Sequence, residues 1–190
     1  PSGSLNSIGL DVETASKKFG ILQIIEERNI GTIVGGTASL SFKAKVTSAS
    51  AGRLDNIKAV VLSWDSTADV VTSDVVSAWG VEDTTPTWAT NWTAENVPAN
   101  LGVTASWATY TVEGISIDTA STTNVAVFIW SDGLSGTVTD FLHITDIQLE
   151  KGDTANDFAY MSYGEQLADC QRYCPRLDFA VGGSPTFLGR

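Results

Sequence analysis

Tryptophan is the residue type in this chain best suited to recognition chemistry. Six of the 190 residues are Trp, and three of them, Trp79, Trp88 and Trp92, fall within an irregular segment, residues 66–103. Sugar rings stack on exposed aromatic faces because their axial C–H groups meet the negative face of the ring, while neighbouring polar side chains bind the hydroxyls. An exposed loop aromatic without a partner is unfavourable. We therefore expect Trp79, Trp88 and Trp92 to contact a glycan, with Trp64 as a further candidate.

The sequence contains no recognisable set of catalytic residues. His143 is the only histidine, and its place in an alternating strand favours a packed or edge residue over a general base. The 22 acidic residues could form many carboxylate pairs, and spacing singles out none of them. We therefore expect that the chain is not an enzyme.

Metal and cofactor sites are equally sparse. The loop 65–74 is rich in oxygen ligands but lacks the Gly and terminal Glu of an EF-hand loop, so a structural calcium is an open alternative and no other cofactor is expected. Cys170 and Cys174 are four residues apart in a predicted helix, which places their Cβ atoms ~5–6 Å apart, beyond the ~3.5–4.5 Å of a disulfide. Free thiols are predicted, since two ligands alone do not complete a zinc site.

The elements that must position these residues are mainly strands. Residues 38–46 alternate strictly between apolar and polar types, as expected for a strand with one buried and one solvated face. Residues 57–64 are apolar on both faces, as expected in mid-sandwich, and Trp130 closes a strand beside Phe128, which favours a core position. Other strand-like segments are 19–27, 107–112, 124–130 and 137–149. Turn signals without helical crossovers separate them, so the sequence predicts an all-β fold, an antiparallel jelly-roll β-sandwich.

The last thirty residues differ from the rest. Leu167 and Cys170 share a face of a predicted short helix, Glu165 lies near its start, where a carboxylate favours the helix dipole, and Pro175 should end it. We therefore expect a sandwich domain at 1–160, followed at 161–190 by a short C-terminal helix and an irregular tail.

Composition excludes some partners. The chain is 43% hydrophobic and 17% charged, which is typical of a globular protein, and its net charge of −11 disfavours nucleic acid. Its apolar runs are far shorter than the ~20 residues of a membrane-spanning helix, so we expect no membrane insertion.

Two segments near the C-terminus resemble a phage pattern. Residues 141–152 read FLHITDIQLEKG and residues 162–173 read SYGEQLADCQRY. They resemble phage tail-fibre and related virion proteins that carry a carbohydrate-binding-module-like sandwich, in which the closing strand reads roughly ITDVQLEEG and the helix YGEELALCQRYY. The matching residues are Ile144, Asp146, Gln148, Leu149, Glu150, Gly152, Tyr163, Gly164, Glu165, Leu167, Cys170, Gln171, Arg172 and Tyr173.

The resemblance extends upstream and implies further expectations. Residues 39–45 resemble a strand of the same family, and so do residues 105–112, in which Trp107 matches a strand-opening Trp and is expected to be structural. Family members have one or two more strands ahead of the segment around Phe19, which we expect to be missing here.

Three functions remain in competition. The first is a non-enzymatic virion adhesion module, a homotrimer on a tail fibre or receptor-binding protein that contacts host-surface glycans. The second is a capsid or tail decoration protein that uses the same sandwich to contact other virion proteins. The third is an accessory module of a glycan depolymerase. All three place the chain in or near a phage particle.

Overall fold

The computed structural model describes residues 6–49, 53–118, 121–133, 136–165 and 167–168. The chain divides into two compact units, residues 1–158 and 159–190, where the sequence predicted a boundary after residue 160. In the described ranges, no helix is both long enough and apolar enough to cross a membrane.

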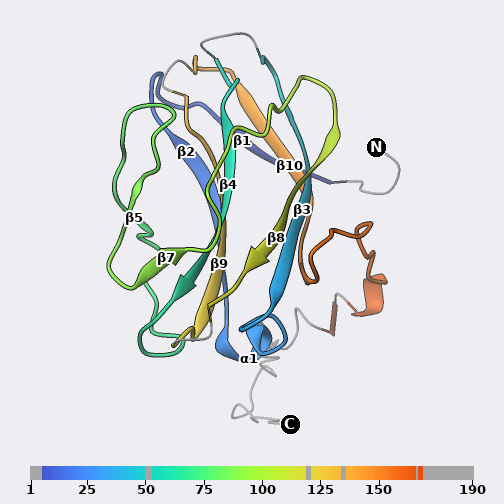
Figure 1. Cartoon of the computed structure of the whole chain (residues 1–190). Helices are drawn as coiled ribbons and strands as arrows, with labels where there is room; N and C mark the ends of the chain where they lie inside the picture. Colours follow the sequence, from blue (N-terminus) through green and yellow to red (C-terminus); the bar gives the residue numbers. More distant parts are fainter. Residues whose placement is uncertain (1–5, 50–52, 119–120, 134–135, 166, 169–190) are drawn as a thin grey trace, which may run out of the picture. The chain divides into compact units, whose positions relative to one another are not determined.

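Eight strands of the first unit form two antiparallel sheets of four strands each (Figure 1). The first sheet has the order β1 (Ile8–Asp11), β10 (Phe141–Lys151), β3 (Thr37–Val46), β8 (Ala108–Ser116). The second has the order β2 (Phe19–Ile25), β9 (Asn124–Ser131), β4 (Ile57–Trp64), β7 (Trp92–Ala94). Along the chain, these eight strands alternate between the two sheets, except that β4 and β7 follow each other in the second sheet. This alternation is typical of a jelly roll. The predicted all-β sandwich is confirmed.

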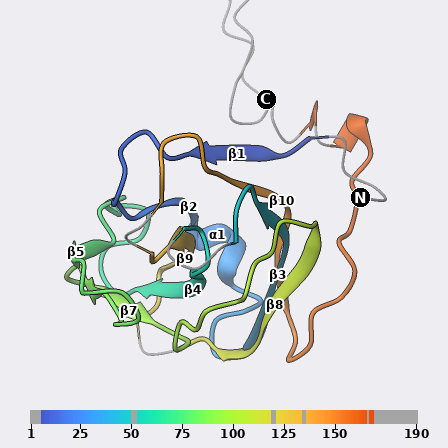
Figure 2. The ribbon, with the colours of Figure 1, turned by 90° about the horizontal axis from the view of Figure 1, so that it is seen from above.

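Three short elements complete the first unit. The single helical turn α1 (Glu27–Ile30) follows β2. The strands β5 (Val76–Ala78) and β6 (Thr87–Trp88) pair with each other in the connection between β4 and β7. Figure 2 shows β5 on the side of the second sheet that faces away from the first sheet.

Alternation along β3 builds the core between the sheets, as the sequence predicted. Leu40, Phe42 and Ala44 are completely buried in this core. Lys43 and Lys45 point to the other face and are partly exposed. Burial of each large apolar side chain stabilises the fold by about 1.5–3 kcal/mol.

A second core explains why β4 and β9 are buried along their whole length. Val61 and Ile129 belong to the core between the sheets, whereas Val60 and Phe128 belong to a separate cluster on the outer face of the second sheet. The segment 65–98, which carries β5 and β6, packs against this cluster. The apolar residues on both faces of β4 therefore pack in two different cores.

A strand ahead of Phe19 is present, contrary to expectation. In β1, Ile8 pairs with Ile144 and Leu10 with Leu142 of β10. The strand has only four residues and lies at the edge of its sheet, so it shows too little periodicity to be recognised from sequence. The expectation that the strands preceding Phe19 are missing is therefore wrong for β1.

The closing strand contains a β-bulge inside the motif that resembles phage sequences. The register between β10 and β3 shifts between Thr145 and Gln148, and Asp146 has a φ of 53°. Asp tolerates this left-handed conformation better than most residues do. Its carboxylate lies 2.9 Å from Lys43 Nζ. The Thr145–Gln148 part of the motif thus encodes a bulge in the backbone.

The described part of the second unit is the start of a helix, with residues 163–165 and 167–168 helical. Ser162 N donates to Glu165 Oε2 at 2.9 Å, and Glu165 N donates to Ser162 Oγ at 3.3 Å. These reciprocal bonds form a capping box. They lower the pKa of Glu165, the backbone N–H of Ser162 having the largest effect. The predicted helix start is confirmed, whereas Cys170, Cys174 and Pro175 lie outside the described residues.

Candidate functional site

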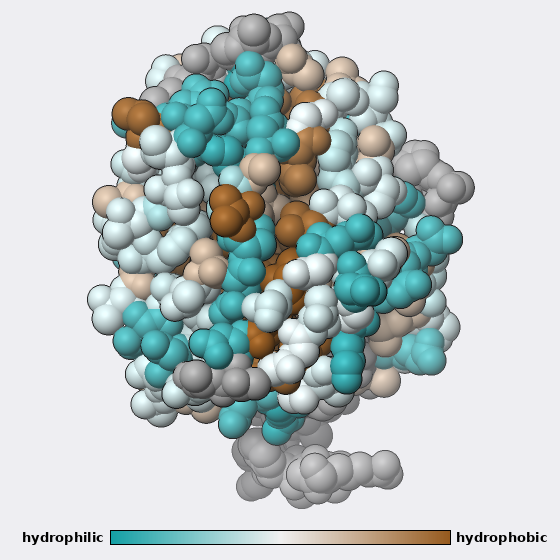
Figure 3. Space-filling model, in the orientation of Figure 1, coloured by the Kyte–Doolittle hydropathy of each residue, from teal (hydrophilic) through white to brown (hydrophobic). Residues whose placement is uncertain are grey.

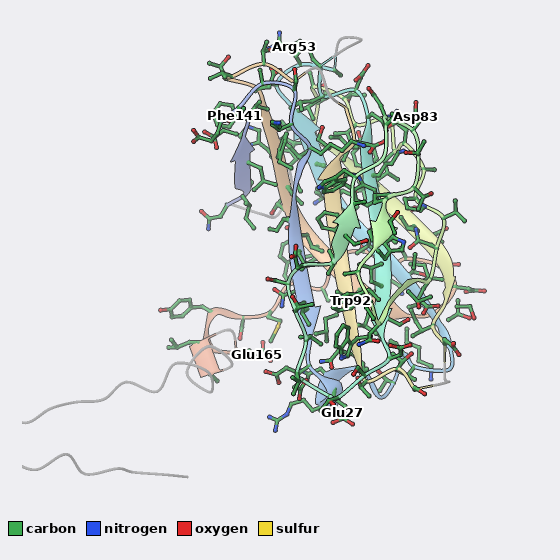
Figure 4. All side chains as sticks on the ribbon, turned by 90° about the vertical axis from the view of Figure 1, so that its left-hand side faces the viewer. Glu27, Arg53, Asp83, Trp92, Phe141 and Glu165 are labelled. Carbon is green, nitrogen blue, oxygen red and sulfur yellow. The ribbon has the colours of Figure 1, made fainter. Side chains whose placement is uncertain are left out.

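Two of the four predicted tryptophans are covered by protein. Trp64 and Trp92 are only 6% and 4% exposed, and their ring centroids lie 5.1 Å apart inside the second core. Figure 4 shows Trp92 among densely packed side chains. Neither ring presents a face to solvent, so we no longer include Trp64 and Trp92 in the candidate glycan site. Their contribution is to hold segment 65–98 on the second sheet.

Trp79 is the exposed member of the predicted set. The residue is 43% exposed, and its ring centroid lies 6.1 Å from that of Phe128 and 6.5 Å from that of Trp130. Phe128 and Trp130 stack at 5.0 Å with an interplanar angle of 9°. Trp88 is half-buried and meets Trp130 edge-on at 6.1 Å. Trp79 is therefore an exposed indole on a base of packed aromatic rings, and Trp130 is confirmed as a core residue.

The carboxylate of Asp132 is completely buried and holds the loop that follows Trp79. It accepts hydrogen bonds from Lys18 Nζ at 2.5 Å, from Lys58 Nζ at 2.8 Å and from the backbone N–H of Asp83 at 2.8 Å. Burial alone would raise the pKa of Asp132, but the bonds from Lys18, Lys58 and Asp83 N together lower it. Figure 4 shows Asp83 at the same end of the sandwich as Arg53, opposite Glu27.

Lys18 connects this ion network to the indole itself. Its Nζ lies 5.6 Å from the centroid of the Trp79 ring, within the range of a cation–π contact. The same ammonium donates to Gly80 O at 3.1 Å and to Val81 O at 3.4 Å. Because the side chain of Lys18 is only 3% exposed, these bonds fix the backbone beside Trp79. A ligand that stacks on Trp79 would meet a ring that is already held in place.

A second aromatic surface lies on the outward face of the first sheet, and sequence reasoning missed it. Trp107, expected to be structural, is half-buried at this face, and Lys45 Nζ lies 5.3 Å from its ring centroid. Its neighbour His143 is also half-buried and stacks on Phe141, with ring centroids 5.8 Å apart. The alternation of β3 and β10 predicts which residues point outward, but only the register of three strands shows that these four side chains meet.

The proposed calcium loop does not gather ligands. In loop 65–74 the Asp69 carboxylate accepts hydrogen bonds from Glu27 N at 3.0 Å and Asn124 Nδ2 at 2.7 Å. These bonds lower the pKa of Asp69, the backbone N–H of Glu27 having the largest effect. Among the described residues, no group of three or more His, Cys, Asp or Glu side chains could hold a metal ion. The carboxylate of Asp69 instead joins loop 65–74 to α1 and β9.

Comparisons with known proteins add a distant structural likeness. No protein-family model matches the chain, and no curated protein matches it. A solved structure with similarity is that of a proposed sugar-binding protein from Bacteroides thetaiotaomicron VPI-5482. It is 14% identical, the match covers 77% of this chain and 75% of that chain, and the TM-score is 0.40. A likeness this distant carries no functional argument, and the phage assignment rests on the sequence resemblance alone.

Proposed function

We propose that this chain is a non-enzymatic carbohydrate-binding module of a phage particle, part of a tail fibre or receptor-binding protein that contacts glycans on the host surface. The observation that supports the glycan contact is Trp79, a residue that is 43% exposed and lies on a base of packed rings. The motifs in residues 141–173 support the phage setting through their resemblance to virion proteins.

The ring of Trp79 supplies a flat apolar face for the C–H groups of a sugar. Polar groups on the same loop supply partners for hydroxyls, since the side chain of Asp83 is 77% exposed. Asn56 Nδ2 donates to Asp83 Oδ1 at 2.7 Å, which orients the carboxylate. An ionised carboxylate accepts about four hydrogen bonds, so Asp83 keeps capacity for a ligand hydroxyl.

A single exposed ring binds one sugar weakly, in the millimolar range, because a small contact yields only on the order of 4 kcal/mol. Several copies on one particle compensate for this, because linked sites raise the effective local concentration. A homotrimer, with many fibres on each particle, is the assembly that suits this chemistry.

The test is binding of the purified chain to an array of bacterial surface glycans. We expect the wild type and Trp79→Phe to bind the same glycans, and Trp79→Ala to bind them about tenfold more weakly, equivalent to about 1.4 kcal/mol. Tyr163→Ala is the matched control, because Tyr163 is a 78% exposed aromatic residue in the second unit. Equal binding by Trp79→Ala and wild type would remove Trp79 from the site.

A decoration or structural role is the second candidate, favoured by exposed apolar residues. Val81 and Val97 are 70% and 86% exposed, and Figure 3 shows hydrophobic side chains gathered in a stripe along the middle of one face. Such surfaces are typical of protein contacts. Binding of the chain to purified particles without glycan binding would favour this candidate.

A further inference from the structure

Four side chains form one continuous row across the outward face of the first sheet. They are Phe141 and His143 from β10, Lys45 from β3, and Trp107 immediately before β8. We call these four residues the outer aromatic row. The register places His143 opposite Lys45, and the ring centroids of His143 and Trp107 lie 6.3 Å apart. From β10 to the residue before β8 the row spans two strand spacings, about 10 Å.

The edge strand β1, which lies beside β10, leaves the outer aromatic row uncovered at His143. Gly9 of β1 pairs with His143, and a Cβ added to Gly9 would lie 3.4 Å from His143 Nδ1 and 3.9 Å from Phe141 Cδ1. Any larger side chain at Gly9 would therefore lie against the imidazole and the neighbouring ring. Glycine leaves this part of both rings accessible.

The row also contains a cation without a carboxylate partner. Among the described residues, Lys18, Lys43 and Lys58 each lie within 4.0 Å of a carboxylate oxygen. Lys45 has no such partner in the described part of the chain, and its ammonium rests over the Trp107 ring. Burial, and then the charge of Lys45, lower the pKa of His143, so the imidazole is neutral at pH 7.

Acidic side chains near the row are already engaged or lie at its far end. Asp146 forms an ion pair with Lys43, and Glu150 accepts hydrogen bonds from Asn156 N at 2.6 Å and Asn156 Nδ2 at 2.8 Å. Asp11 pairs with Phe141 at the opposite end from Trp107. The Trp107 end of the row therefore has one cation over one face of a flat ring.

We propose that the outer aromatic row is a second saccharide site, selective for sugars that carry a carboxylate, such as hexuronic acids. The sugar ring replaces the Lys45 ammonium over the Trp107 ring, the ammonium turns to bind the sugar carboxylate, and a hydroxyl of the same sugar bonds to the His143 imidazole. One cation suits one carboxylate, whereas a polyanion would be repelled by a chain of net charge −11. The site is separate from Trp79, which packs on rings of the second sheet.

The single histidine makes the site directly observable. Because His143 is the only histidine of the 190 residues, its Hε1 proton gives one resolved imidazole signal in the NMR spectrum of the whole chain. We would titrate the protein with methyl β-D-glucuronide and, separately, with methyl β-D-glucoside, which differs at C6 by the carboxylate. We expect the glucuronide to shift the Hε1 signal, to raise the pKa of His143 and to bind at least tenfold more tightly than the glucoside.

Variants assign the effect to individual groups. Lys45→Gln should remove the preference for the glucuronide, Trp107→Ala should remove the response to both sugars, and Trp107→Phe should restore it in part. Lys151→Gln is the matched control, because Lys151 is an exposed lysine at the end of β10, the strand that carries His143. Thermal unfolding of each variant identifies any loss of fold. No shift with either sugar, equal binding of the two sugars, or an unchanged preference in a folded Lys45→Gln variant would each overturn the proposal.

Discussion

Lys18 Nζ lies 2.5 Å from Asp132 Oδ1, although the two residues are 114 positions apart, and both side chains are almost completely buried. This ion pair joins the start of β2 to the end of β9 and to the backbone beside Trp79. The position of the exposed indole thus depends on a buried charge network formed by distant parts of the chain.

Replacement of Asp132 should therefore destabilise the fold. Asp132→Asn removes the carboxylate paired with the buried ammonium groups of Lys18 and Lys58 and leaves Lys58 only its 3.6 Å contact with Asp83. Breaking a buried ion pair costs about 3–5 kcal/mol. We expect a loss of this size in the free energy of unfolding, measured by urea titration at pH 7. Asp65→Asn, at an exposed aspartate, is the control and should change stability by less than about 0.5 kcal/mol. Equal stability of the two variants would show that the network contributes little.

Gly20 is required by the close approach of β2 to β9. A Cβ at this position would lie 2.7 Å from Trp130 Cβ and would also collide with the carbonyl oxygen of Ile129. Gly20→Ala should therefore lower the free energy of unfolding by about 1–3 kcal/mol.

Gly31 provides the matched control for Gly20. It ends α1 with a φ of −57°, and an added Cβ there meets no atom within 4 Å. Gly31→Ala should be neutral or stabilise the protein by about 0.4–1 kcal/mol, because alanine restricts the unfolded chain. The free energies of unfolding of Gly20→Ala and Gly31→Ala would be measured side by side by urea titration. Similar free energies for the two variants would contradict the close approach of β2 to β9 at Gly20.

The bulge in β10 predicts an order of tolerance at Asp146. Asn accepts a φ of 53° but lacks the charge paired with Lys43, whereas a β-branched residue is strained in this conformation. We expect Asp146→Val to destabilise the protein by about 1–3 kcal/mol more than Asp146→Asn does, because both variants lose the carboxylate paired with Lys43 and only valine adds backbone strain. Thermal melts would check this order, with Thr109→Val in β8 of the same sheet as the control for a new valine. A more stable Asp146→Val than Asp146→Asn would argue against the left-handed conformation.

The local pattern of apolar and polar residues predicted the central strands. Long-range contacts determined which aromatic side chains are buried and which are exposed. The alternation of β3 and the two apolar faces of β4 follow directly from residue types. The sequence pattern around Trp92 does not differ from that around Trp79 in any way that predicts burial. The Trp92 ring packs in the second core. The Trp79 ring lies outside that core against Lys18, a residue far away in sequence. Sequence reasoning likewise gave Trp107 only a structural role, because it lacked the register that sets this ring beside Lys45 and His143.

The buried carboxylates of Asp140 and Asp132 should make the free energy of unfolding depend on pH in the acidic range. Asp140 is completely buried; burial alone would raise its pKa, but hydrogen bonds from Arg53 Nε at 2.9 Å and from Thr137 N and Oγ1 at 3.1 and 3.0 Å together lower it. The pKa of Asp132 is lowered in the same direction. When the folded pKa lies below the unfolded value of about 3.9, the unfolded chain binds more protons between the two values. The contribution of both carboxylates is therefore fully present above about pH 5 and is lost as the pH falls through the unfolded and then the folded pKa.

Asp140→Asn isolates one part of this acid sensitivity. At pH 7 the variant should be about 1–3 kcal/mol less stable than wild type, because it loses a charged acceptor for Arg53. Between pH 5 and pH 3 its stability should fall less steeply than that of wild type, because one of the protons taken up on unfolding is no longer bound. Urea titrations at pH 7, 5, 4 and 3 measure both quantities, with Asp65→Asn again as the exposed control. An acid slope in Asp140→Asn as steep as that of wild type would mean that the carboxylate of Asp140 does not carry this dependence.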